Sequence, residues 1–419
     1  MKIAVIGAGI SGIAAAYHLQ NGHDVTLIER GNKIGGHANS VTVDDGTLCG
    51  TNIDTGFIVF NDRNYPLFNK FLHHFGVGLV ETDMSFSYAN INTKVGYAGT
   101  LKGLTPTLSE TFSLAHWLRI KRLYKYSRIL ASFEERDLPS TNIVDCLDKI
   151  GCPKDVVENY FIPMASAIWS CKPSDSREIP SRAFVDFFLN HGLLGFKHRP
   201  KWNTVKGGSQ SYLEAFRHSF QGQIKVNQEV NSVLERNSKV FVKTKSNVEW
   251  FDFVVIATHA DTCLEILPNM SETERSILLK HRYGENEVVL HTDEKLMPAN
   301  KRIWASWNVK GGKSENGKTV FQTSYFMNRL QRLKSDHSYI VTVNPSQDPD
   351  ANSILYSTKY KHPLLTQDKA SNGSDFKHLN QGGKIFFCGS YFGYGFHEDG
   401  FDSGFKVAQI LKKRQVESQ

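Results

Sequence analysis

The sequence predicts an α/β fold whose central parallel sheet is assembled from segments that lie far apart in the chain. Near the N-terminus, a short apolar run is followed by closely spaced glycines, a helical pattern and a second apolar run. Two further short apolar runs lie at 254–257 and 385–388, and the second ends at Gly389. Runs of this kind are typical of parallel strands that are buried on both faces. We therefore expect the chain to leave this sheet and to return to it.

The composition is that of an ordinary globular protein with room for two or three domains. The chain has 419 residues, of which 22% are charged and 40% hydrophobic, and its formal net charge is +7. This mild basic excess fits an anionic ligand, a membrane surface or no charged partner at all, and no zinc-finger spacing or compact basic block points to nucleic acid. The six cysteines form no CxxC pair, which favours reduced thiols in a cytoplasmic protein over a metal site or a redox dithiol. No run of 18 apolar residues predicts a membrane-spanning helix.

The first thirty residues carry the clearest motif. We expect a strand at Lys2–Ile6, the turn GAGISG at 7–12, a helix over Ile13–Asn21 and a strand at Asp24–Ile28 that ends at Glu29. This order is the Rossmann-like dinucleotide fingerprint, which is weak as a lone G-x-G-x-x-G and strong with both strands and the acid in place. The lysine, the apolar run and the three alanines would also suit a signal peptide, but the spaced glycines favour the dinucleotide site.

The fingerprint residues have distinct physical roles. Gly7 permits the tight turn, and Gly9 lets a pyrophosphate approach the backbone at the positive end of the following helix. Gly12 allows that helix to pack closely on the strand, and Glu29 can accept hydrogen bonds from ribose hydroxyls. Between the glycines, Ile10 and Ser11 complete the predicted phosphate-binding turn.

The second strand leads into the run ERGNKIGGH at residues 29–37. This run resembles the flavin-containing amine oxidase superfamily, whose members carry an E-R-x-x-R-x-G-G-R-like run at this place. The matching residues in ERGNKIGGH are Glu29, Arg30, Gly35 and Gly36, whereas Lys33 and His37 replace two further arginines. In that family this loop lies along the pyrophosphate and reaches the flavin edge. The run Asp54-Thr55-Gly56-Phe57 is similar to the family's D-x-G segment, which also lines the flavin.

The resemblance implies FAD as the cofactor and assigns residues to it. Val230 would offer backbone groups to the adenine. Binding is expected to be non-covalent, because no residue matches an attachment motif, although Cys388 and His37 are chemically able to be linked. The expected cofactor-binding residues are Gly7, Gly9, Ile10, Ser11, Gly12, Glu29, Arg30, Gly35, Gly36, His37, Thr55, Gly56, Phe57, Val230, Ala257, Gly389, Phe396, His397 and Gly400.

The stretch CGSYFGYGFHEDGFDSGF, residues 388–405, is expected to form the reactive end of the site. A strand at Ile385–Cys388 ends at Gly389, and Asp399 is expected to cap a helix. In the superfamily this helix N-terminus points at the flavin, and its dipole stabilises the negative charge of the reduced flavin. The rings expected beside the flavin are Tyr391, Tyr394 and Phe396.

No catalytic base is assigned, because superfamily flavins often react without an obligate side-chain base. For the acids near the helix start, capping is favoured over chemistry. The candidates for catalytic residues are Phe396, His397 and Glu398, with His37 as a further titratable group.

The same resemblance divides the chain into two domains. It implies an FAD-binding domain of the GR2, or amine-oxidase, type from residues 1–60, 202–263 and 380–419. The insertions at 61–201 and 264–379 would build an α+β substrate-binding domain, which is rich in aromatic residues.

Two stretches, FIVFNDRNYPLFNKFL and TDMSFSY, resemble a bacterial subgroup of predicted NAD/FAD-binding proteins. Genes of that subgroup often neighbour those for cyclopropane-fatty-acid-synthase-like methyltransferases. The resemblance therefore implies an FAD-dependent oxidoreductase acting on a hydrophobic substrate such as a fatty-acyl chain. Hydride abstraction, desaturation or a related rearrangement at flavin N5 would be its chemistry.

Two alternatives stay open. The first is an amine oxidase that makes an imine and hydrogen peroxide. Against it, Phe396 replaces the tyrosine of that family's aromatic cage, whose partner ring would be Tyr360, and Asn286 or Glu287 replaces the family's lysine at flavin N5. The second is a flavin-binding accessory partner of a lipid methyltransferase.

Residues 111–133 form a basic, Trp-bearing amphipathic pattern without an acidic residue. Such a helix can lie in an anionic membrane interface, which would place a cytoplasmic protein peripherally on the inner membrane face. The alternative is a core helix with a solvated basic face.

Overall fold

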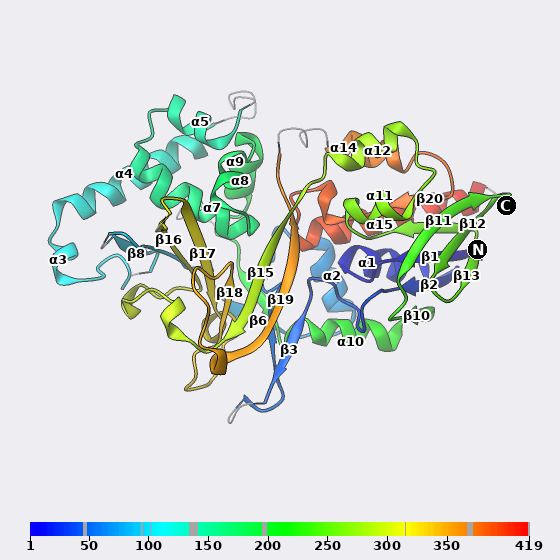
Figure 1. The fold of residues 1–419 in the computed structure, drawn as a ribbon, viewed down its shortest axis with the longest axis horizontal. Helices are drawn as coiled ribbons and strands as arrows, with labels where there is room; N and C mark the ends of the chain where they lie inside the picture. The colour runs from blue at the N-terminus through cyan, green and yellow to red at the C-terminus, as the bar shows by residue number, and fades with distance from the viewer. Residues whose placement is uncertain are drawn as a thin grey trace.

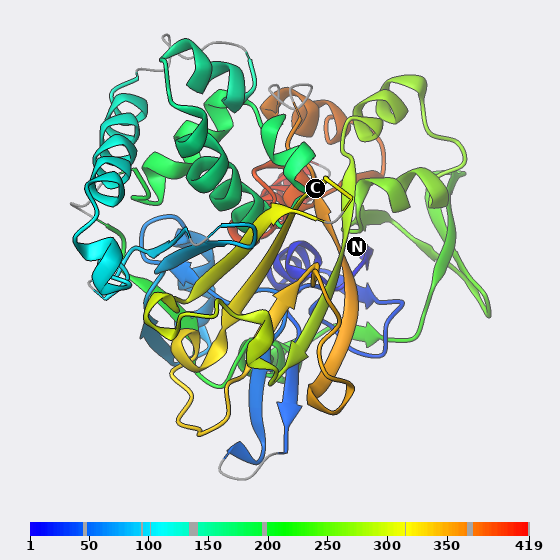
Figure 2. The same cartoon turned by 60° about the vertical axis from the view of Figure 1, so that its left-hand side comes forward.

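A computed structural model describes residues 1–44, 48–93, 95–100, 102–133, 141–194, 199–314, 316–366 and 372–417. Figure 1 shows a parallel sheet with its helices on the right, near both termini, and a large mixed sheet covered by helices on the left. Figure 2 shows the same two parts after rotation. The chain is an α/β protein, as the sequence predicts.

The parallel sheet has the strand order β10-β2-β1-β14-β20, and its strands come from three separate regions of the chain. Their interior-facing runs of Val and Ile are buried because helices cover the sheet. The strands are β1 (Lys2–Ile6), β2 (Asp24–Ile28), β10 (Gln223–Lys225), β14 (Phe253–Ile256) and β20 (Ile385–Phe387).

Two helices pack against each other on this sheet. Helix α1 (Ile10–Leu19) begins directly after Gly9, so the expected start at Ile13 is wrong by one turn. The second helix is α15 (His397–Glu417), which lies against α1. The remaining helices near this part are α2 (Pro66–His74), α10 (Gln210–Ser219), α11 (Ala260–Ile266), α12 (Glu272–Leu279) and α14 (Asn372–Leu379).

An antiparallel meander connects β10 to β14. It consists of β11 (Val230–Arg236), β12 (Lys239–Thr244) and β13 (Val248–Phe251). Asn237 and Ser238 have positive φ at the first turn, a conformation that favours short polar side chains.

The second large sheet has seven strands in the order β19-β15-β18-β17-β16-β7-β8. The β16–β7 pair is parallel, and the other pairs are antiparallel. The strands are β7 (Phe86–Asn90), β8 (Gly96–Ala98), β15 (Tyr283–His291), β16 (Trp307–Lys313), β17 (Thr319–Phe326), β18 (Ile340–Val343) and β19 (Ile354–Pro363).

A layer of helices packs beside this sheet around an aromatic core. Phe161, Phe184 and Phe188 are completely buried there, and Trp169 lies next to them. The elements of the layer are α3 (Leu108–Thr111), α4 (Leu114–Ala131), α5 (Ile143–Lys149), α6 (Lys154–Val156), the π-helical turn η3 (Val157–Phe161), α7 (Ile162–Trp169), α8 (Pro173–Arg177) and α9 (Ser181–Asn190).

Two further sheets among the described residues are small. The first pairs β3 (Ser40–Val43) with β4 (Thr51–Asp54), and the second has the order β5-β9-β6, with β5 (Phe60–Asn61), β6 (Leu79–Thr82) and β9 (Trp202–Val205). The short remaining elements are η4 (Glu294–Leu296), η5 (Lys301–Ile303), α13 (Met327–Leu330), η6 (Ala351–Ser353) and η8 (Ser390–Phe392). Within the described ranges, no helix has both the length and the apolar character needed to cross a membrane.

Candidate active site

The glycine-rich turn between β1 and α1 has the geometry of a phosphate-binding turn. Gly7 has a φ of +98°, which L side chains rarely adopt. A Cβ at Gly12 would stand 1.9 Å from the Gly7 carbonyl oxygen, so only glycine lets α1 lie this close to the turn. A Cβ at Gly9, by contrast, would meet no atom within 4 Å. The space beside Gly9 is therefore left open by the fold, at the N-terminal end of α1.

The second glycine segment lies directly against the first. Gly35 donates its N–H to the Ala8 carbonyl at 2.8 Å and pairs with Gly9 in an isolated parallel bridge. The Glu29 carboxylate, at the end of β2, accepts hydrogen bonds from the N–H groups of Ala8 and Gly31 at 2.9 and 2.8 Å. The two segments thus form one continuous backbone surface.

The segment Asp54–Phe57 is anchored by a buried carboxyl group. Asp54 accepts hydrogen bonds from the Ser40 hydroxyl at 2.6 Å and from the Ser209 N–H at 2.8 Å. Burial raises the pKa of Asp54 to about 7, and these hydrogen bonds oppose the shift. Asp54 therefore holds the start of α10 against this segment, which leads into the cavity wall at Phe57.

The C-terminal loop brings a second helix start to the same place. A Cβ at Gly400 would stand 2.8 Å from the Ile10 side chain, so the first turns of α15 and α1 are in close contact. The helix begins at His397, and the expectation that Asp399 is its N-cap is wrong. Asp399 lies within the first turn, where its carboxylate accepts a hydrogen bond from the Phe396 N–H at 2.8 Å. The acid still satisfies a helix-end donor, but from inside the helix.

Glu398, one of the candidate catalytic residues, is bound to another helix. Its two carboxylate oxygens accept hydrogen bonds from the N–H groups of Leu67 and Phe68, in the first turn of α2, at 2.8 and 3.0 Å. Burial raises the pKa of Glu398 to about 7. Capping is thus the visible role of this side chain, as the sequence reasoning favoured for the acids of this loop.

His397 is packed among aromatic rings. Its imidazole stacks on Phe57 with ring centroids 3.7 Å apart, and its Nε2 is 3.0 Å from the Tyr212 hydroxyl. Burial lowers the pKa of His397 well below its ordinary value, and His37 acts in the same direction. The ring is therefore neutral, and it supports Phe57 at the edge of the cavity.

A cavity of about 940 Å³ runs along these segments. Most of the expected cofactor-binding residues line it, whereas Gly12, Thr55 and Gly400 lie behind its wall. The lining members are Gly7, Gly9, Ile10, Ser11, Glu29, Arg30, Gly35, Gly36, His37, Gly56, Phe57, Val230, Ala257, Gly389, Phe396 and His397.

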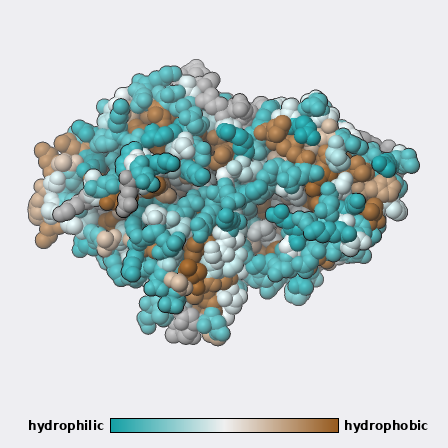
Figure 3. All heavy atoms as spheres, viewed as in Figure 1, coloured by the Kyte–Doolittle hydropathy of each residue, from teal (hydrophilic) through white to brown (hydrophobic). Residues whose placement is uncertain are grey.

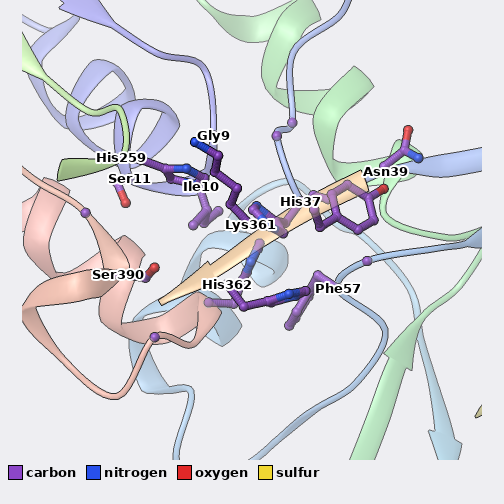
Figure 4. Close-up of a pocket in the computed structure, with 18 of the residues that line it drawn as sticks. Gly9, Ile10, Ser11, His37, Asn39, Phe57, His259, Lys361, His362 and Ser390 are labelled. Carbon is purple, nitrogen blue, oxygen red and sulfur yellow. The ribbon is translucent and has the colours of Figure 1, made fainter. Parts of the chain in front are cut away.

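Three histidines from distant segments meet in this cavity, and sequence reasoning singled out only one of them. The ring of His37 lies 5.8 Å from that of His259 and 5.2 Å from that of His362 (Figure 4). Burial lowers the pKa of His259 to about 4 and that of His362 to about 3. Nε2 of His37 is buried and has no hydrogen-bond partner among the described residues. The only sequence signal for His362 is the alternation along β19, which puts it on the same face as Tyr360.

The two residues that stand where the family's lysine is expected, Asn286 and Glu287, differ in burial. Asn286 on β15 is buried, and its Nδ2 donates a hydrogen bond to Nδ1 of His362 at 2.9 Å. Glu287 is exposed on the opposite face of the strand. Tyr360 lines the cavity, with its hydroxyl 3.0 Å from the Thr55 hydroxyl.

Another part of the cavity lining is aromatic. Phe396 stacks on Phe187 of α9 with ring centroids 4.7 Å apart, and Trp169 of α7 lies next to both. Trp307 and Tyr325, from β16 and β17, also line the cavity and contact each other edge to face. The lining of one cavity therefore combines a glycine-rich part with an aromatic part, which we call its apolar end.

Residues 10–344 match the family model of the flavin-containing amine oxidoreductases. The chain belongs to this family. It is therefore an FAD-dependent oxidoreductase, and the structure provides a fitting place for the cofactor. A dinucleotide fits the open space beside Gly9, where its phosphates would meet the N-terminal end of α1. It can also form a hydrogen bond with Nε2 of His37, which has no partner among the described residues. Glu29, Gly9 and Val230 are the residues we expect to hold it.

Solved structures agree on the fold. A CLA-producing fatty acid isomerase from P. acnes has a TM-score of 0.68 at 14% identity, covering 98% of each chain. Cyclohexylamine oxidase from Brevibacterium oxydans has a TM-score of 0.68 at 15% identity, covering 99% of each chain. At such identities the likeness concerns the fold alone.

A short sequence match exists to a curated protein, 4,4'-diapophytoene desaturase from Staphylococcus aureus. The identity is 50% over 49 residues, which is 12% of this chain. The matched part spans only 10% of the desaturase.

Proposed function

We propose that the substrate is a fatty-acyl or other long hydrophobic chain, whose C–H bond is oxidised or rearranged. The observation that carries this proposal is the apolar end of the cavity, where Trp169, Phe187 and Phe396 supply a continuous aromatic wall. Rings of this kind hold an aliphatic chain through a large area of apolar contact. They do not determine which carbon of that chain reacts.

The acidic residues of the cavity lining come from different helices, strands and loops than the aromatic rings do. The acids that line the cavity are Glu29, Glu229, Glu265 and Glu285. None of them belongs to α7, α9 or the 389–397 loop, which supply the rings. At these rings a charged amine would find cation–π contact but no carboxylate partner, whereas an acyl chain needs neither.

Bound FAD supplies a hydride acceptor, and the protein's own residues bind the substrate and shape its surroundings. The aromatic wall orients the acyl chain of the substrate and excludes water. The buried histidines stay neutral, because burial lowers the pKa of His259 and His362 far below their ordinary value, so they add no positive charge beside an apolar substrate.

The structural likeness to a protein named as a fatty acid isomerase and the short match to a protein named as a desaturase are in keeping with the proposal. The alternative, an amine substrate, has support from the fold of cyclohexylamine oxidase. The experiment below distinguishes the acyl substrate from the amine substrate.

The test is an anaerobic titration of the purified, FAD-loaded protein with unsaturated or methylated phospholipids and, separately, with monoamines and polyamines. Flavin bleaching by a lipid indicates net oxidation. A lipid product with a moved double bond and no lasting bleaching indicates rearrangement, because the hydride then returns to the substrate. Either result supports the proposal. Bleaching by an amine, with every lipid left unchanged, would refute it.

A further inference from the structure

An exposed apolar tip stands at the edge of the helical layer. Phe112 is 84% exposed, Leu108 79% and Leu114 75%. Trp117 and Leu118, one turn further along α4, are exposed as well. We call these five residues the apolar tip. In Figure 3 a hydrophobic area lies at the left-hand edge of the molecule, where Figure 1 places α3 and α4. Contiguous apolar patches of this kind mark interaction surfaces.

The tip is an ordered structure. The Thr107 hydroxyl accepts a hydrogen bond from the Glu110 N–H at the start of α3, and the Ser113 hydroxyl accepts one from the His116 N–H at the start of α4. The Trp117 indole N–H donates to the Thr111 carbonyl at 2.9 Å. The apolar side chains are therefore held outward by capped helices.

The exposed face of α4 turns from apolar to basic along the helix. Residues three or four apart share a helix face, so Lys121, Lys125 and Arg128 follow Leu114, Trp117 and Leu118 on one side. All three basic side chains are exposed. The opposite face of α4 is fixed in the core through buried Tyr126 and Leu130.

We propose that the apolar tip inserts into the interface of an anionic lipid bilayer while the basic residues of α4 contact the headgroups. The order of side chains fits this arrangement, because Leu, Phe and Trp enter the acyl boundary and Lys and Arg stay at the headgroup level. A second copy of the chain fits less well, since it would bring one basic face against another.

The proposal goes beyond the proposed function and holds whichever substrate the enzyme uses. The two are nevertheless connected through the core. Tyr126 and Leu130 of α4 belong to the same packed cluster as Trp169 and Phe187, which line the cavity. Docking would place the helical layer that carries the aromatic wall next to the bilayer.

The test measures co-flotation of the full chain with vesicles of phosphatidylcholine alone and of phosphatidylcholine mixed with phosphatidylglycerol that carries the same acyl chains. The variants are Phe112→Ser/Leu114→Ser for the tip and Lys121→Gln/Lys125→Gln for the charge. Leu279→Ser is the matched control, because Leu279 on α12 is 58% exposed and lies far from α4 in the chain.

We expect the wild type and the control to bind the anionic vesicles with similar affinity. The tip variant should bind them at least about tenfold more weakly, since each large apolar side chain transferred from water contributes about that factor. The charge variant should lose the preference for anionic vesicles, and added salt should have the same effect on the wild type.

Two results would overturn the proposal. One is an absence of wild-type binding to the anionic vesicles, or binding that the tip substitutions leave unchanged. The other is a concentration-dependent dimer that the tip substitutions dissolve without altering vesicle binding, which would make a second copy the occupant. Because both kinds of vesicle carry the same acyl chains and differ only in their headgroups, failure of the acyl-chain proposal would not affect either result.

Discussion

Replacing Gly9 by alanine separates cofactor binding from folding. A Cβ at this position meets no protein atom within 4 Å, and Gly9 has a φ of −72° and a ψ of −179°, which any residue can adopt. Alanine is a poorer N-cap than glycine by up to about 1 kcal/mol. It also reduces the freedom of the unfolded chain, which stabilises by roughly 0.4–1 kcal/mol. The two effects offset each other, so the apo-protein should keep its melting temperature.

FAD binding should suffer instead. The methyl group would occupy the space that lets a pyrophosphate approach the backbone at the start of α1. Losing one hydrogen bond to a charged group costs about 1.5–3 kcal/mol, which corresponds to roughly ten- to a hundredfold weaker binding. The assay is a titration of the apo-protein with FAD, followed by the quenching of flavin fluorescence, next to thermal unfolding of the same sample.

Gly12→Ala is the matched comparison. Its Cβ would stand 1.9 Å from the Gly7 carbonyl oxygen, which belongs to the backbone and cannot rotate away. Overpacking of this kind costs about 1–3 kcal/mol or more, so this variant should lose thermal stability without any cofactor present. Unchanged FAD affinity in Gly9→Ala would refute the placement of the pyrophosphate beside Gly9.

Three further predictions concern the cavity and its supports. Glu398→Ala should lower the free energy of unfolding by about 1–3 kcal/mol, because two N–H donors at the start of α2 lose their acceptor. Glu398→Gln retains one acceptor oxygen, so its free energy of unfolding in urea should lie between those of the wild type and Glu398→Ala. Burial lowers the pKa of His362 to about 3, so its contribution to stability is present above pH 6.5 and is lost as the pH falls towards the folded value, by at most about 1.4 kcal/mol per pH unit. His362→Gln should therefore show a smaller difference in unfolding free energy between pH 7.5 and pH 5 than the wild type, and an equal difference would contradict the neutral burial of this ring. Phe396→Ala should raise the KM for an acyl substrate about tenfold by removing part of the aromatic wall, while FAD affinity stays within about twofold, and the reverse pattern would place Phe396 at the cofactor.

The glycine-rich turn could be predicted from the sequence because its constraints are local. Within a turn of six residues, Gly7, Gly9 and Gly12 are needed for the backbone conformation and for close contacts that a Cβ would prevent. The strands on either side are short apolar runs. The parallel sheet followed from the same kind of signal at β14 and β20. The helix start at Ile10 was missed because a buried turn of α1 has no polar capping side chain to mark it.

The contacts between distant segments could not be predicted in this way. Glu398 caps a helix that begins about 330 positions earlier in the chain, and nothing near it in the sequence identifies that partner. The meeting of His37, His259 and His362 likewise depends on how three separate segments pack. Such contacts arise from the tertiary arrangement, and the residues involved carry no local pattern that announces it.

The most direct test of the acyl-chain proposal is a single-turnover reaction under anaerobic conditions. The FAD-loaded protein is mixed with a phospholipid whose acyl chains are either normal or fully deuterated, and flavin absorbance is followed in time. We predict loss of flavin absorbance, transient or lasting, that is slower with the deuterated chain, because a C–H bond of the chain is broken in that step. No absorbance change with any lipid, together with bleaching by an amine, would contradict the account.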